Sequence, residues 1–204
     1  MESARYRLSF TAGGLLQQES VQLAQLYLDL KDWTAVRDKA LSDNILQART
    51  VNTSKRFCRE IISRLKMLSS GELDLLVQGS IQEQAQLLWV SLCRRYQFIA
   101  DFAVEVLHEK HRGLQPDLQH ADFDSFFNHK SEWHSELEAI KPSTRNKLRQ
   151  VLFKILQDAD LLSGAYTITP ALISPRVDEL LKQGNAQDLL LFPVNDPEQQ
   201  RRTP

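Results

Sequence analysis

Apolar residues recur at helical spacing along most of this chain. A period of three to four residues places them on one side of an amphipathic helix, and five regions follow it: residues 15–30, 33–41, 72–78, 81–112 and 144–162. The fourth region is apolar on nearly all sides, which is typical of a helix in a protein core. Because about thirty residues is long for a globular helix, we expect a break near Arg94 and Arg95.

After Gly164 the pattern changes. Residues 165–174 alternate and are rich in β-branched side chains, which predicts a strand that Pro170 confines to a sheet edge. Pro175 begins a helix that runs to about Gln183, and Leu189–Val194 predicts a second strand. The expected fold class is therefore mainly α: a compact helical globule whose C-terminal helix is followed by two short strands, as in a degenerate winged module.

The N-terminal part has the order of a helix-turn-helix unit. Asp32 begins one short helix, and a polar connection leads to a second helix that Asn52 or Thr53 caps. The connection, residues 42–52, is longer than a standard turn, so only a helix-turn-helix-like arrangement is expected. We divide the chain into an N-terminal helical subdomain, 1–79, and a part containing the core helix and the C-terminal basic helix, 80–204. One continuous globular unit is the alternative.

Composition indicates an ordinary soluble protein. Of 204 residues, 42% are hydrophobic and 25% are charged, which argues against disorder. The two cysteines, Cys58 and Cys93, form no CxxC motif, which fits a reducing compartment. The longest apolar run, Leu87–Leu92, is too short to cross a bilayer. We expect a cytoplasmic protein with no membrane partner that is a monomer when isolated.

Charge separates two helices from the rest of the chain, although the chain as a whole has a net charge of only −1. Between Arg49 and Lys66, six Lys or Arg residues accompany one acid, Glu60, and between Lys141 and Gln157 five accompany none. A cationic helix face attracts a phosphate backbone, because each neutralised phosphate releases condensed counterions. The candidate DNA-binding residues are Arg49, Lys55, Arg56, Arg59, Lys66, Arg145, Lys147, Arg149 and Lys154.

Each basic face also has other interpretations. It can be a solvated helix face, or it can meet an acidic partner protein or the chain's own acidic and aromatic segment, Asp122–Glu138. Phe57 and Phe153 lie with the apolar residues of their helices, so neither basic face carries aromatic residues for stacking on single-stranded bases. This pattern favours contact with a duplex backbone.

No motif predicts catalysis or a metal site. Glu105, His108 and His111 are spaced by three, but a carboxylate bundle needs a second Glu-x-x-His, and the run HEKH lacks the HExxH spacing. The sequence contains no GxSxG elbow and no phosphate-binding glycine loop. Cys58 lies at the edge of an apolar stripe and is interpreted as a structural thiol. We expect no catalytic residue, no metal and no cofactor, and therefore a protein that is not an enzyme.

Three long segments resemble, in sequence, order and spacing, the BrxA proteins of bacteriophage-exclusion (BREX) defence systems. They are TAGGLLQQES (Thr11–Ser20), NILQARTVNTSKRFCREIISRL (Asn44–Leu65) and STRNKLRQVLFKILQDADLL (Ser143–Leu162). The resemblance extends from about Arg7 to Val194. It implies a small, mostly helical, non-enzymatic core component of a multi-protein phage-defence system that binds double-stranded DNA. It also implies that methylation and ATP-dependent steps belong to other BREX subunits.

Two functional hypotheses follow. In the first, the chain is a DNA-binding subunit that contacts mainly the phosphate backbone. In the second, it is an adaptor whose basic faces dock on acidic partner subunits of the defence complex. A steep salt dependence of binding to naked DNA would separate the two.

Overall fold

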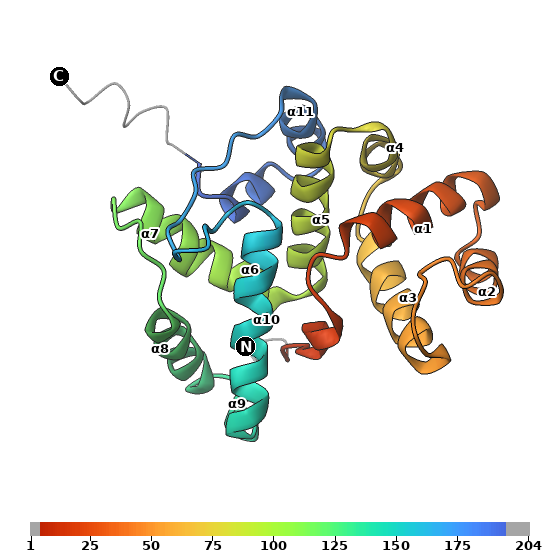
Figure 1. The fold of residues 1–204 in the computed structure, drawn as a ribbon. Helices are drawn as coiled ribbons and strands as arrows, with labels where there is room; N and C mark the ends of the chain where they lie inside the picture. Colours follow the sequence, from red (N-terminus) through yellow and green to blue (C-terminus); the bar gives the residue numbers. More distant parts are fainter. Residues whose placement is uncertain (1–4, 195–204) are drawn as a thin grey trace.

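The computed structural model describes residues 5–194, which fold mainly into helices (Figure 1). The elements are, in chain order, η1 (Ser9–Ala12), α1 (Gln17–Leu30), α2 (Trp33–Ser42), α3 (Val51–Leu65), α4 (Ser70–Gln78), α5 (Ile81–Arg95), α6 (Gln97–Phe102), the π-helix η2 (Ala103–His108), α7 (Glu109–Arg112), α8 (His120–Ser131), α9 (Ser135–Glu138), α10 (Pro142–Asp158), α11 (Pro175–Gly184) and η3 (Ala186–Leu191). The mainly α fold class is confirmed.

The first three long helices form the helix-turn-helix-like part. In Figure 1, α1, α2 and α3 lie together at one side of the molecule, and each packs on the other two. Asp32 caps α2 as expected: its carboxylate accepts hydrogen bonds from the backbone N–H groups of Thr34 and Ala35, at 2.9 and 3.3 Å. The α2–α3 connection spans residues 43–50, longer than the three or four residues of a standard turn.

The long apolar region is broken where the sequence predicts. Helix α5 ends at Arg95, and Tyr96 has extended dihedral angles (φ −125°, ψ 93°) before α6 begins. Ser80 and Glu83 form a capping box at the start of α5. The break turns the chain within the core, because Tyr96 itself is fully buried.

The core is built around α5 and the aromatic residues that follow it. Trp89 and Phe102 are fully buried, and the Trp89 indole N–H donates to the Leu191 carbonyl at 2.9 Å. Phe102 meets Phe126 of α8 edge-on, with ring centroids 5.3 Å apart. The aromatic side of the 122–138 segment therefore belongs to the core.

Buried residues on both sides of residue 79 belong to one contiguous hydrophobic cluster. Helices α1, α3 and α4 all pack against α5. The domain boundary at residue 79 stays a prediction. The shared hydrophobic cluster shows that the parts before and after this residue pack closely together.

The two predicted strands of the winged module are wrong. Within residues 5–194, the 165–174 segment makes only isolated bridges, Asp117 to Thr167 and Leu162 to Ile168. The second segment is the 3-10 helix η3 followed by a short extended end. A β-branched segment needs a neighbouring strand to form a ladder, and here its neighbours are helices and irregular loops.

Helix α10 is also shorter than predicted. It ends at Asp158, because Asp160 adopts a left-handed conformation with φ +56°. Leu161 and Leu162 still point into the core beyond the helix end.

Candidate nucleic-acid interface

Helix α3 carries the first basic face. Thr50, and not Asn52 or Thr53, caps it: the chain is extended at Thr50, whose Oγ1 accepts the Thr53 N–H at 3.2 Å. The helix therefore begins at Val51. Cys58, Ile61 and Leu65 are fully buried on the inner side, so the predicted apolar stripe orients the opposite side toward solvent.

A groove of about 590 Å³ runs between α2 and α3. Four cationic side chains and one acid lie among its walls. The lining residues are Trp33, Thr34, Arg37, Asp38 and Leu41 of α2, together with Lys55, Arg59, Ile62, Ser63 and Lys66 of α3 or its C-terminal end. Three of the predicted site residues, Lys55, Arg59 and Lys66, thus share one cavity.

The cations of α3 in this groove are available to a ligand. Lys55, Arg59 and Lys66 are exposed, and none of them makes an ion pair within residues 5–194. Across the groove, Arg37 is held by Asp38 at 2.8 Å, with both side chains more than half exposed. An exposed pair of this kind is weak because water and salt screen its charges, so it can open when an anion approaches.

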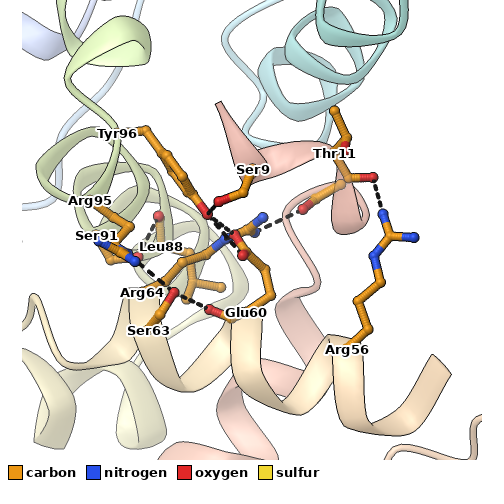
Figure 2. A network of polar contacts seen from close by, with 11 residues as sticks. Ser9, Thr11, Arg56, Glu60, Ser63, Arg64, Leu88, Ser91, Arg95 and Tyr96 are labelled. Carbon is orange, nitrogen blue, oxygen red and sulfur yellow. Dashed lines mark hydrogen bonds and ion pairs between the residues drawn. The ribbon is translucent and has the colours of Figure 1, made fainter. Parts of the chain in front are cut away.

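Arg64, which the charge count of residues 49–66 includes, lies on the inner side of α3. It is 1% exposed, and its Nε donates to Glu60 at 2.7 Å while Nη1 donates to the Gly14 carbonyl at 3.0 Å. Tyr96 donates its hydroxyl to the same Glu60 carboxylate at 2.7 Å. Glu60 and Arg64 neutralise each other inside the protein, so the outward charge of the window is carried by its other five Lys and Arg residues (Figure 2).

Two further predicted residues lie near the groove. Arg56 is exposed, but its Nη2 donates to the Thr11 carbonyl at 2.9 Å, which ties α3 to the N-terminal arm, residues 5–16 (Figure 2). Arg49 is exposed just before the Thr50 cap. Arg56 therefore has a structural contact that Lys55 and Arg59 lack.

The second basic face is largely occupied by the chain's own acidic segment. Arg145 lies 3.0 Å and Arg149 2.6 Å from the carboxylate of Asp124 in α8. The Arg145 guanidinium also lies 4.5 Å from the ring centroid of Phe127. For these two arginines, the structure shows contact with the 122–138 segment, one of the alternatives considered above.

The remaining cations of α10 differ from these arginines. Lys154 is exposed and pairs with Asp158 at 3.0 Å, whereas Lys147 is exposed and makes no ion pair within residues 5–194. The two basic helices do not form one patch: η1 packs against both α3 and α10, and the N-terminal arm passes between them in Figure 1.

Two groove residues were missed by sequence reasoning. Arg37 is followed by Asp38, so in a charge count along α2 the negative charge of Asp38 cancels the positive charge of Arg37. The helical pattern of residues 33–41 indicates only that Trp33 packs, and its ring does stack on Tyr27, with centroids 3.9 Å apart and planes inclined by 10°. It also lines the groove and is only half-buried. Only the arrangement of α2 against α3 reveals both roles.

The two cysteines and the possible metal ligands were the other candidates for chemistry. Burial raises the pKa of the Cys58 and Cys93 thiols, so both are protonated at neutral pH. Within residues 5–194, no three His, Cys, Asp or Glu side chains gather as metal ligands. Among the same residues, no helix combines the length and the apolar character required to cross a bilayer.

Comparison with known proteins finds one family. The family model described as BrxA matches residues 4–185. A BREX protein BrxA from Escherichia coli O9:H4 (strain HS) is 29% identical over 185 residues, which cover 87% of this chain and 84% of that protein. A BREX protein BrxA from Paramagnetospirillum magneticum is 25% identical over 189 residues, or 92% of this chain and 95% of that protein.

The fold is also found in a solved structure. The crystal structure of an uncharacterized protein from Magnetospirillum magneticum superimposes with a TM-score of 0.81 and 23% identity, covering 93% of this chain and 98% of that one. At this identity, the likeness shows a shared fold.

Proposed function

The chain belongs to the BrxA family and is a component of a BREX phage-defence system; on that premise, we propose that it is a cytoplasmic, non-enzymatic subunit that binds double-stranded DNA. In this proposal, the rim of the α2–α3 groove contacts the phosphate backbone, and other surfaces of the chain bind other BREX subunits. The protein carries no chemistry of its own and supplies a DNA contact to the assembly.

The observation that carries the proposal is the set of exposed cations Lys55, Arg59 and Lys66, aligned along one groove of a chain with net charge −1. Their spacing of four and then seven residues places them on one side of the helix, about one and about two turns apart. A row of unpaired cations is suited to successive phosphates, which carry no sequence information. Arg145 and Arg149 contribute less, because Asp124 already neutralises part of their charge.

The proposal predicts a steep and local salt dependence. The variant Lys55→Ala/Arg59→Ala should bind unrelated duplexes more weakly by similar factors, because phosphate contacts do not read bases. Each lost phosphate contact removes about 0.9 from the log–log salt slope, so the slope should fall by up to roughly 2. Fluorescence anisotropy at several salt concentrations measures both quantities.

A matched control removes two cations elsewhere. Arg112 and Lys182 are exposed and form surface ion pairs with Glu109 and Asp178, at 2.9 and 2.6 Å. The variant Arg112→Ala/Lys182→Ala should keep the log–log salt slope of the wild-type protein. The two slopes should differ by no more than the contribution of about half a phosphate contact. Equal weakening by both double variants would mean a general charge effect, and the groove assignment would be wrong.

The adaptor hypothesis gives the opposite result. In that case Lys55→Ala/Arg59→Ala leaves DNA affinity unchanged, while another BREX subunit is lost from pull-downs with the variant. A third variant, Lys147→Ala/Lys154→Ala, measures the share of α10, and we expect it to lower the slope less than the α3 variant does.

A further inference from the structure

The α2–α3 groove is more than a charged surface, because its wall is partly aromatic and apolar. The Trp33 ring packs one face against Tyr27, and the indole contributes to the lining of the groove. Leu41 and Ile62 add apolar surface on the two sides. This apolar wall would not help to bind phosphates, since contact with apolar surface does not stabilise phosphate oxygens.

The size of the groove limits what can enter it. Its volume of about 590 Å³ is that of a small-ligand site. Packed helices lie about 8–10 Å apart, so the space between α2 and α3 is too narrow for a duplex. A duplex can lie across the rim, but only a single unstacked nucleotide can reach the floor.

The charges suit the same occupant. Lys55, Arg59 and Lys66 follow one edge of the groove, so phosphates on either side of an inserted nucleotide would lie against cations. Base–aromatic stacking beside a positively charged groove is the usual chemistry for holding unpaired nucleotides. The groove combines both elements, whereas the basic face of α10 does not: Phe153 is buried there.

We propose that the α2–α3 groove takes one unpaired deoxynucleotide of a DNA strand, with its base against the indole of Trp33 and its flanking phosphates on Lys55, Arg59 and Lys66. This inference rests on the proposed DNA-binding function and narrows it. DNA that carries an extrahelical nucleotide is then the preferred ligand, since its base is already outside the stack and costs little to insert.

The test compares two labelled duplexes that differ by one extrahelical thymidine. Stacking of one base is worth about 1–3 kcal/mol, so the wild-type protein should prefer the bulged duplex by roughly 5- to 160-fold. Trp33→Leu should abolish this preference while changing affinity for the perfect duplex less than about twofold, because Lys55 and Arg59 remain. Trp33→Phe keeps a ring and should retain most of the preference.

The chain offers a matched control in Trp133, which is 72% exposed and lies two residues after the end of α8. Trp133→Leu should keep the preference of the wild-type protein. Melting curves of each variant identify loss of fold, and Trp33→Phe, which preserves the stack on Tyr27, keeps the comparison valid if Trp33→Leu does not fold.

The outcomes separate this proposal from the one it rests on. Salt-dependent binding of both duplexes with equal affinity would overturn the pocket and leave the duplex-binding function standing. Binding of the bulged duplex without binding of the perfect one would support the pocket and refute duplex binding. Thymidine 5′-monophosphate serves as the free-nucleotide probe: if it competes at the same concentration as the bulged duplex, the ligand is a free nucleotide, and the assignment to DNA fails.

Discussion

The Glu60→Ala substitution tests how the basic helix is held in place. Glu60 lies on the inner side of α3, where its carboxylate accepts hydrogen bonds from Arg64 Nε at 2.7 Å and from the Tyr96 hydroxyl at 2.7 Å. The side chains of Arg64 and Glu60 are 2% and 9% exposed. Removing the carboxylate leaves the Arg64 guanidinium buried, with the Gly14 carbonyl as its remaining hydrogen-bond acceptor within residues 5–194.

The expected loss is large because a buried charge is left without its counter-charge. Breaking a buried pair from one side costs about 3–5 kcal/mol in the free energy of unfolding. For a chain of this size, each kcal/mol shifts the melting temperature by about 2–4 °C, so Tm should fall by about 6–20 °C. Urea titration gives the free energy, and circular dichroism gives Tm.

Two comparisons make the result decisive. Asp178→Ala breaks an exposed pair with Lys182 at 2.6 Å and should cost at most about 1 kcal/mol. Glu60→Leu/Arg64→Met replaces the pair by apolar residues and should recover most of the stability. A loss below about 1 kcal/mol for Glu60→Ala would refute the view that this pair anchors α3.

Two further predictions concern the core and acid stability. Phe102→Ala, at a fully buried position, should cost about 3–5 kcal/mol by urea titration, and an unchanged midpoint would show that the core is centred elsewhere. Burial acts to raise the pKa of Glu72, but hydrogen bonds and charge from Arg94 and the Ser69 N–H outweigh it and lower the pKa below the ordinary 4.5. The stability that Glu72 contributes is therefore present above pH 4.5 and is lost as pH falls through the lower folded-state pKa. Glu72→Gln should flatten that part of a plot of unfolding free energy against pH. An unchanged plot would contradict the lowered pKa of Glu72.

The helices that sequence predicted well are those with local signals. The stripe of Ile61 and Leu65 defines the inner side of α3, and the Asp32 cap marks the start of α2. Both signals lie within a few residues of the element they define. The strand predicted over residues 165–174 failed for the opposite reason: ladder formation depends on a distant partner that no local pattern reports.

The candidate site shows the same limit. A charge count finds the basic segment but not that Arg64 is turned inward, since Tyr96 and Gly14 are brought to it only by folding. The charge count also gives Arg145 the same weight as Lys55, although Asp124 of another helix forms an ion pair with Arg145. The groove itself needs α2 to pack on α3, so no inspection of a single helix could have predicted it.

The N-terminal arm has a consequence for how the protein is made. Its backbone N–H groups at Tyr6 and Leu15 donate to Glu136 and Asp158, which lie 130 and 143 residues later in the chain. The ribosome delivers the arm first, yet its carboxylate partners emerge only after more than half of the chain has been made. The contacts of the arm with α3 can form early, but its contacts with Glu136 and Asp158 form only after these residues leave the exit tunnel.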